Sequence, residues 1–342
     1  MNAPATSKGR IACFGELLLR LTAPGRELLL QSARLDVCVG GAEANVATGL
    51  ACLGHHSRMV GILPDNALGR TAIGELRRHG VDVATLSTGP GRMGLYFLTP
   101  GAGLRASDIV YDRAYSAFAL AAADAIDWTQ ALAGMDWLHL SGITPALGSV
   151  PAQAARRGVA AAKAAGVKIS FDGNYRARLW EAWDSDPRAI LTELVSSADL
   201  FFGNHRDMAL LLGTPFDGDG ADRRRHAAEA GFAAFPNLRW IASTARHVDD
   251  ADRHRLSARI DTRERDWQTP EVVVAGIVDR IGGGDAFAAG ILHGLLSGQN
   301  EENAVASGLA LACLKHSLPG DASLFGQSDI DAFLEGGLDV RR

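Results

Sequence analysis

Apolar runs and helical segments alternate along most of the chain. RIACFGELLLRL near the N-terminus predicts a buried first strand, and GGAEANVATGLACLG then predicts a helix rich in small residues. Further apolar strands, each followed by a helical segment, are expected at WLHLSGI, KISFDGN, DLFFGN and LRWIAST. Such alternation predicts a parallel sheet covered by helices on both faces, with ligands bound beyond the carboxyl ends of the strands.

Two stretches interrupt this alternation. RLTAPGRELLLQSARLDVCV and MGLYFLTPGAGLRASDIVYDRAYS contain strand-like runs separated by the turn signals Pro24-Gly25 and Pro100-Gly101. We expect them to form a small β-sheet over the mouth of the main sheet, with strands from about 20–39 and 93–115.

Composition is that of a soluble globular protein, with 47% hydrophobic and 21% charged residues in 342. No linker or repeat divides the chain, so residues 11–342 are expected to form one domain after a disordered tail at 1–10.

A net charge of −5 without a long basic block argues against a nucleic-acid partner. The longest uncharged stretch near the C-terminus, Ala286–Asn300, is too short and glycine-rich to span a membrane. Four cysteines without a CxxC pair indicate reduced thiols in a cytoplasmic protein.

The stretch DRIGGGDAF, Asp279–Phe287, contains the main candidate chemistry. Gly282–Gly284 precede an apolar helix expected at Asp285–Ser297, and a glycine-rich helix start exposes amides that bind anions. The carboxylate of Asp285 would repel a phosphate, but it suits accepting the proton of a hydroxyl group that attacks that phosphate. The alternative is a glycine turn with Asp285 as the helix cap. This stretch alone favours neither interpretation.

Other phosphate motifs are absent from the sequence or lack the right context. No GxxxxGK[ST] motif is present, and GPGRMG at Gly89–Gly94 leads into a strand rather than a helix, so we interpret it as a turn. The charge clusters DRRRH and DDADRHR are interpreted as solvated surface.

Two segments, GGAEANVATGLACLG and VDRIGGGDAFAAG, resemble the two signature regions of the ribokinase-like (PfkB) carbohydrate kinases, and the resemblance extends from Ile11 to Asp321. Within that family, LHLSGITPAL, FDGNYRARLW and GLYFL with VYDRA are most similar to 2-keto-3-deoxygluconate kinases. The resemblance implies a ribokinase-like fold, a parallel-sheet three-layer α/β/α core with a small β-sheet lid that often forms a dimer interface. It also implies transfer of the γ-phosphate of ATP to a sugar hydroxyl with Mg²⁺, and leaves a requirement for a monovalent cation such as K⁺ open.

The resemblance assigns roles to individual residues. Asp285 would be the catalytic base and Gly282, Gly283 and Gly284 the anion hole. The residues expected to bind the sugar are Gly41, Ala42, Glu43, Ala44, Asn45, Tyr96, Tyr111, Arg113 and Arg176. Those expected to bind ATP are Asn174, Asn204, Ser243, Thr244, Gly282 and Gly284. Asp207 replaces the glutamate of the family's Asn-x-x-Glu and would organise Mg²⁺ indirectly.

Three arginines bear on the substrate. Arginine pairs with carboxylates in a fork geometry, so Arg113 and Arg176 are candidates for recognising a sugar acid. Arg176 could instead face the ATP phosphates, and either arginine could form only a surface salt bridge. Arg20 stands where many neutral-sugar kinases have an acidic residue, which favours an acidic substrate. ARHVDDADRHR replaces the family's glycine-containing loop and leaves the adenine contacts open.

These observations predict an ATP-dependent kinase that phosphorylates the terminal (6-) hydroxyl of 2-keto-3-deoxygluconate. The alternatives are a fructokinase or other neutral-sugar kinase of the same fold, and a catalytically weak sugar- or nucleotide-binding regulator. The expected partners are the sugar acid, ATP and further copies of the chain joined through the lid, with no nucleic acid or membrane. The epimer of the sugar stays open.

Overall fold

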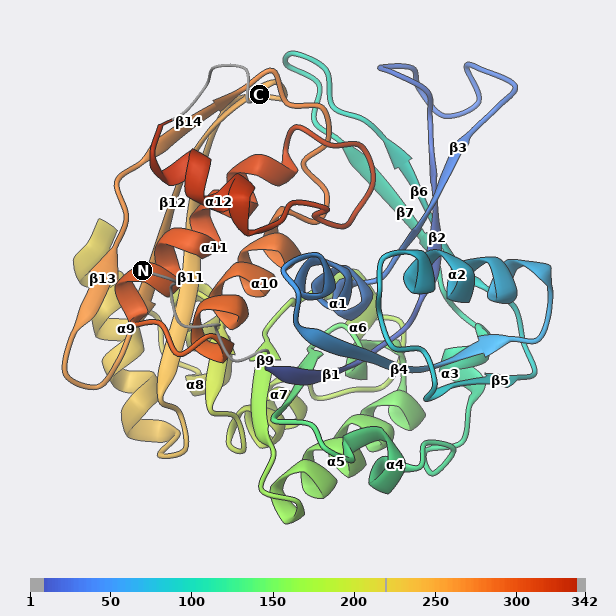
Figure 1. Ribbon diagram of the computed structural model, residues 1–342, viewed down its shortest axis with the longest axis horizontal. Helices are drawn as coiled ribbons and strands as arrows, with labels where there is room; N and C mark the ends of the chain where they lie inside the picture. The colour runs from blue at the N-terminus through green and yellow to red at the C-terminus, as the bar shows by residue number, and fades with distance from the viewer. Residues whose placement is uncertain (1–8, 219, 337–342) are drawn as a thin grey trace, which may run out of the picture.

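The computed structural model describes residues 9–218 and 220–336 (Figure 1). Most of the predicted tail lies outside these residues, and the first strand begins at Arg10. Within the described part of the chain, no helix combines the length and the apolar character needed to cross a membrane.

The core is a mostly parallel sheet with the strand order β13-β12-β11-β10-β9-β8-β1-β4-β5, in which β14 also pairs with β12. Strands β5 to β11 of this order run parallel, whereas β12 is antiparallel to β11, β13 and β14. The strands are β1 (Arg10–Phe14), β4 (His56–Pro64), β5 (Leu86–Gly89), β8 (Trp137–Ser141), β9 (Lys168–Asp172), β10 (Leu200–Phe202), β11 (Trp240–Asp250), β12 (Arg253–Asp261), β13 (Asp266–Gln268) and β14 (Val272–Ala275).

Helices cover both faces of this sheet, as the alternation of apolar segments predicts (Figure 1). Side chains alternate across a strand, so Ile11 and Cys13 of β1 join one hydrophobic cluster while Ala12 and Phe14 join the other. The first cluster includes α1 (Ala42–Cys52), α2 (Ala67–Arg78), α10 (Gly283–Leu296), α11 (Glu301–Lys315) and α12 (Gln327–Leu334). The second includes α3 (Ala117–Leu120), α4 (Trp128–Leu132), α5 (Ser149–Ala164), α6 (Ala177–Trp180), α7 (Pro187–Val195), α8 (His205–Leu212), α9 (Gly220–Ala234) and the 3₁₀ turn Pro145–Leu147.

A separate four-stranded sheet forms the lid, as predicted from the two interrupting stretches. Its order is β3-β2-β6-β7, with β2 parallel to β6. In Figure 1 these strands rise beside the core, at the upper right of the view. The lid strands are β2 (Leu18–Thr22), β3 (Asp36–Gly40), β6 (Gly94–Thr99) and β7 (Asp108–Asp112).

Two local expectations are wrong. RIACFGELLLRL is not one strand, because the chain leaves the main sheet after Phe14 and enters the lid at Leu18. Helix α10 begins two residues earlier than expected, at Gly283, because Gly282 adopts the left-handed conformation that caps it. The stretch ARHVDDADRHR, which replaces the family's loop, forms the end of the long antiparallel β11–β12 hairpin, with Ala245 paired to Ser257.

Helices α10 and α11 pack closely enough to require glycine at their contact. A Cβ added at Gly290 would lie 2.6 Å from Ser307 O and 2.7 Å from Gly308 Cα. These are backbone atoms, so a larger side chain must separate the two helices that hold the glycine turn.

We therefore expect Gly290→Ala to lower the free energy of unfolding by about 1–3 kcal/mol, as overpacking does. Gly74→Ala is the matched control, because Gly74 is an exposed position in α2 where a Cβ meets nothing within 4 Å. Removing that glycine should stabilise the protein by roughly 0.5–1 kcal/mol. Urea unfolding measures both changes, and equal effects of the two substitutions would contradict the tight contact.

Candidate active site

The glycine turn has a strict need for glycine at one position. Gly282 has φ 80° and forms the N-cap of α10. A Cβ there would lie 1.6 Å from Asp321 O, a backbone atom of the loop after α11. Any other residue at position 282 would therefore both strain the backbone and push the two loops apart.

The turn leaves amide groups available at the start of α10. The first helical hydrogen bond is donated by the amide of Ala286 to Gly282 O at 2.8 Å, and the amide of Gly283 donates to Arg280 O at 3.3 Å. The amides of Gly284 and Asp285 precede the regular bonding of the helix and carry its positive end. The helix start therefore offers the amides of Gly284 and Asp285 to an anion at the position predicted for Gly282–Gly284.

Asp285 does not cap the helix, so the capping alternative is wrong. It is the third residue of α10, and Gly282 provides the cap without a side-chain bond. The carboxylate of Asp285 accepts a hydrogen bond from the side-chain amide of Asn45, on α1, at 2.6 Å. Burial raises the pKa of Asp285 to about 8, opposed by the Asn45 hydrogen bond and reinforced by Asp172, Asp321 and Glu43. This carboxyl can therefore exchange a proton near neutral pH, as a general base must.

Two cavities meet at the glycine turn. One, of about 610 Å³, extends under the lid and includes Asp285 in its lining. The other, of about 830 Å³, extends over the β11–β12 hairpin and α9. Gly283 and Gly284 line both cavities. A donor bound in the larger cavity and an acceptor bound in the smaller would therefore have their reacting ends at the free amides. The other residues common to both linings are Arg176, Asn204, Arg246 and Arg280.

The smaller cavity brings together most of the residues predicted to bind sugar. Those that line it are Gly41, Ala42, Asn45, Tyr96, Tyr111, Arg113 and Arg176. The prediction is wrong for Glu43 and Ala44, because successive positions on a helix face different directions. Glu43 instead accepts a buried hydrogen bond from the hydroxyl of Ser141 at 2.6 Å, and Ala44 is packed in the core.

Arg113 and Arg20 have different environments, although sequence reasoning linked both to an acidic substrate. Arg113 lines the smaller cavity, and its Nε donates to Glu16 at 2.6 Å in a buried ion pair, not a surface one. Arg20 is buried in ion pairs with Asp279 (2.6 Å) and Asp321 (2.8 Å). Its charge is therefore neutralised by these carboxylates outside the lining of the smaller cavity, and Arg20 gives no support for an acidic substrate.

The aromatic residues of the lid close one side of the smaller cavity. Tyr96 is 6% exposed and its hydroxyl donates to Asp321 at 2.7 Å. The rings of Tyr96 and Tyr111 have centroids 6.3 Å apart. With Leu18 and Leu98 they form a small apolar cluster that contacts Ile281, immediately before the glycine turn.

The residues predicted to bind ATP divide between the cavities. Thr244 lines the larger cavity, but Ser243 does not, since neighbouring side chains of a strand point to opposite faces. Asn204 lines both cavities, whereas Asn174 and Gly282 line only the smaller one. Asn174, two residues after the end of β9, has left-handed backbone with φ 39° and lines the smaller cavity.

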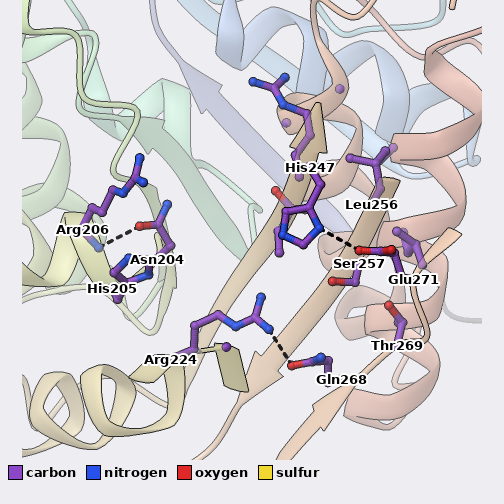
Figure 2. Close-up of a pocket in the computed structure, with 18 of the residues that line it drawn as sticks. Asn204, His205, Arg206, Arg224, His247, Leu256, Ser257, Gln268, Thr269 and Glu271 are labelled. Carbon is purple, nitrogen blue, oxygen red and sulfur yellow. Dashed lines mark hydrogen bonds and ion pairs between the residues drawn. The ribbon is translucent and has the colours of Figure 1, made fainter. Parts of the chain in front are cut away.

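The larger cavity is rich in arginine, a feature that sequence reasoning missed. Figure 2 shows Arg206 and Arg224 extending toward it from one side and His247 and Glu271 from the other, with a hydrogen bond of 3.0 Å from Arg224 to Gln268. The cluster DRRRH, interpreted as surface, contributes Arg223 and Arg224 to this lining. Arg246 and His247 come from the start of the stretch that replaces the family's glycine-containing loop. Arginines suit a polyphosphate because each offers several fixed donors. The arginines in the lining are Arg176, Arg206, Arg223, Arg224, Arg246 and Arg280.

The carboxylates of the smaller cavity fit an indirect role toward Mg²⁺. Asp207 accepts from the amide of Asn204 at 2.8 Å in the capping box of α8, and burial raises its pKa. Burial also raises the pKa of Asp172, to about 7. Among the described residues, no group of three metal-ligating side chains converges. Mg²⁺ needs only one or two carboxylates when phosphates and waters complete its coordination, so this donor set suits an ion delivered with the nucleotide.

The fold and the site together indicate a phosphotransferase, with an arginine-rich cavity and a cavity that contains the buried carboxyl of Asp285 joined at the first amides of α10. A model of the pfkB family carbohydrate kinases matches residues 8–324, and the chain belongs to this family. The molecule is therefore a carbohydrate kinase with the ribokinase-like fold.

Several relatives act on sugar acids or sugars. The chain is 31% identical over 329 residues to a 2-dehydro-3-deoxygalactonokinase of Haloferax volcanii, with 96% of this chain and 97% of that one covered. It is also 31% identical over 316 residues to a fructokinase of Klebsiella pneumoniae, with 89% and 91% covered. The crystal structure of a 2-dehydro-3-deoxygluconokinase from Thermotoga maritima matches with a TM-score of 0.91 and 34% identity, over 96% of this chain and 100% of that one.

The raised pKa of Asp285 has a consequence for stability. An unfolded aspartate loses its proton at about pH 4, whereas Asp285 in the folded protein keeps its proton up to about pH 8. Between these values the folded protein binds a proton that the unfolded chain has lost. Stability therefore falls as pH rises through this range. We expect Asp285→Asn to raise the melting temperature above wild type at about pH 9, with a smaller gain at about pH 5. Differential scanning fluorimetry measures both values, and a gain that does not grow with pH would contradict the raised pKa.

Proposed function

We propose that this kinase transfers the γ-phosphate of ATP to the terminal (6-) hydroxyl of 2-keto-3-deoxygluconate, also called 2-dehydro-3-deoxygluconate, with Asp285 as the general base. The observation that supports this most directly is the position of Asp285, beside the free amides of α10 and at the junction of the two cavities. The acidic substrate is favoured by relatives that carry the names of 2-dehydro-3-deoxy sugar acid kinases.

The arrangement separates the roles of the two substrates. The arginine-lined cavity holds the nucleotide phosphates, and the sugar lies under the lid with its terminal hydroxyl beside Asp285. Asp285 accepts the hydroxyl proton while Asn45 keeps the carboxylate oriented. The amides of Gly284 and Asp285 and the helix dipole stabilise charge on the transferring phosphoryl group. Mg²⁺, when bound, neutralises phosphate charge, and Asp207 with Asp172 would hold its waters. Closure of the lid excludes water from this junction.

Carboxylate recognition is assigned to Arg113 and Arg176. Glu16 accepts the hydrogen bond from Nε of Arg113. The terminal nitrogens of Arg113 can therefore donate toward the cavity. Arg176 is exposed at the junction, where it reaches either the sugar carboxylate or the phosphates. A neutral-sugar kinase is the second candidate, because the match to a fructokinase is as high in identity as the match to a sugar acid kinase. A regulator without catalysis is disfavoured by the intact Asp285 site.

We further propose that the protein is cytoplasmic and self-associates through the lid. All four cysteines are free thiols, as cytoplasmic proteins require, although Cys38 and Cys52 are only partly buried. On the lid, Val37 and Val110 are 59% and 50% exposed. An apolar outer sheet face of this kind suits a second copy of the chain, which sedimentation velocity would detect as a dimer.

A substrate panel tests the sugar assignment. With ADP release as the readout, 2-keto-3-deoxygluconate or its galactonate epimer should give the highest kcat/KM, above fructose, ribose and tagatose. Arg176→Gln should raise KM for the sugar acid by about 10- to 100-fold, since a hydrogen bond to a charged group contributes roughly 1.5–3 kcal/mol. The KM of this variant for ATP should not change. A preference for fructose would replace the proposal with the second candidate, and a rise only in KM for ATP would assign Arg176 to the nucleotide.

Removal of the base tests the mechanism. Asp285→Asn should lower kcat by about 10²- to 10⁴-fold, the usual contribution of a general base, with nucleotide affinity retained. Asn at this position can still accept the hydrogen bond from Asn45, so the fold should be kept. Asp124→Asn, at an exposed loop position, is the control and should match wild type. Turnover of Asp285→Asn within a few-fold of wild type would rule out the base assignment.

A further inference from the structure

Lys315 is a fully buried cation directly below the glycine turn. It is the last residue of α11, and its side chain is 0% exposed. Its ammonium donates to two backbone carbonyl oxygens, Asp279 O at 3.3 Å and Leu318 O at 3.0 Å. The chain has 34 basic residues but only four lysines, so a buried lysine is unusual in a sequence that otherwise uses arginine.

The two carbonyls belong to the loops that carry the anion-binding amides. The loop from Val278 to Gly282 leads into α10, and the loop from His316 to Asp321 follows α11. The amides of Val278 and Gly320 tie the loops together, donating to His316 O at 2.8 Å and to the carboxylate of Asp279 at 3.1 Å. Asp279 O lies three residues before Gly282, which itself rests on Asp321 O. A cation that holds Asp279 O therefore fixes the path of the chain into the turn.

The surrounding charges favour one positive charge at this point. Asp279 and Asp321 carry two negative charges, and Arg20 supplies one compensating positive charge through its ion pairs with both. Burial lowers the pKa of Lys315, while Asp279 and Asp321 act in the opposite direction. Without Lys315, the buried carboxylate of Asp321 and the partly buried one of Asp279 would share a single arginine, and two partly buried carbonyls would lose their lysine donor.

The chemistry of this position is that of a monovalent-cation site. Backbone carbonyl oxygens are the ligands that replace the water around K⁺ in proteins. A lysine ammonium is a compact point charge with three donors, and here the carbonyls already bind it. The two carbonyl oxygens are therefore already bound by the Lys315 ammonium, and this set of ligands does not fit an added alkali-metal ion.

We propose that Lys315 is a built-in monovalent cation that holds the glycine turn in its phosphoryl-transfer conformation, so that the enzyme needs no K⁺. Lys315 is a positioning residue, because it acts through Asp279 O and the turn and not on the substrates. The inference rests on phosphoryl transfer at the glycine turn, as proposed above, and is independent of which sugar is accepted.

Cation dependence of turnover tests this directly. At one ionic strength, which keeps charge screening constant, wild-type kcat should vary by less than about twofold among choline, sodium and potassium chloride. Lys315→Ala removes the ammonium and leaves space. Its kcat should fall at least about tenfold in choline chloride, which corresponds to an increase of roughly 1.4 kcal/mol or more in the activation free energy. In potassium or ammonium chloride its kcat should recover. Lys315→Met removes the charge but fills the space, so its kcat should stay low in every salt.

A second readout does not depend on turnover. The melting temperature of Lys315→Ala should be higher in potassium chloride than in choline chloride, and that of Lys315→Met should not differ. Lys163→Ala is the control, since Lys163 is exposed in the last turn of α5, and it should match wild type in all salts. Activation of the wild-type enzyme by K⁺, or full turnover of Lys315→Met in choline chloride, would overturn the proposal. Failure of the base assignment would instead appear in Asp285→Asn, whatever the salt.

Discussion

The contact between Gly282 and the carbonyl of Asp321 is the constraint on which the site depends. With no room for a Cβ, the left-handed turn can rest on the loop after α11, and α10 can begin with its amides free. The same contact places Asp285 on the first turn of the helix, where it faces the lid cavity beside Asn45. One steric requirement thus positions both the first amides of α10 and the carboxylate of Asp285.

Charged side chains are distributed unequally around this turn. The larger cavity is lined by six arginines and one glutamate, whereas the smaller one is lined by four arginines and by four aspartates, Asp172, Asp207, Asp285 and Asp321. The excess of arginine in the larger cavity suits a polyanion. The grouped aspartates of the smaller cavity raise each other's proton affinity, because like charges disfavour each other's ionisation. The raised pKa of Asp285 follows mainly from its burial and in part from this grouping. The grouping of aspartates therefore contributes to the basicity of Asp285, the base proposed above.

The sequence was sufficient to predict the parallel sheet, the lid and the glycine turn, because each depends on local patterns of apolar residues and glycine. It was not sufficient for side chains whose partners are distant in the chain. Arg20 was assigned by position in a pattern, yet its role is set by Asp279 and Asp321, more than 250 residues away. Arg223 and Arg224 resembled a solvated cluster, because their neighbours in sequence do not reveal the hairpin they face.

The ion pairs of Arg20 also determine how the lid is attached. Arg20 lies in the middle of β2, the strand that enters the lid directly after the main sheet, and it binds a carboxylate in each of the two loops beside α10. The root of the lid is therefore fastened to the same loops that shape the glycine turn. An opening of the lid that keeps these ion pairs must bend beyond Thr22, in the outer strands and their connecting turns, and leaves the backbone of the turn in its present shape.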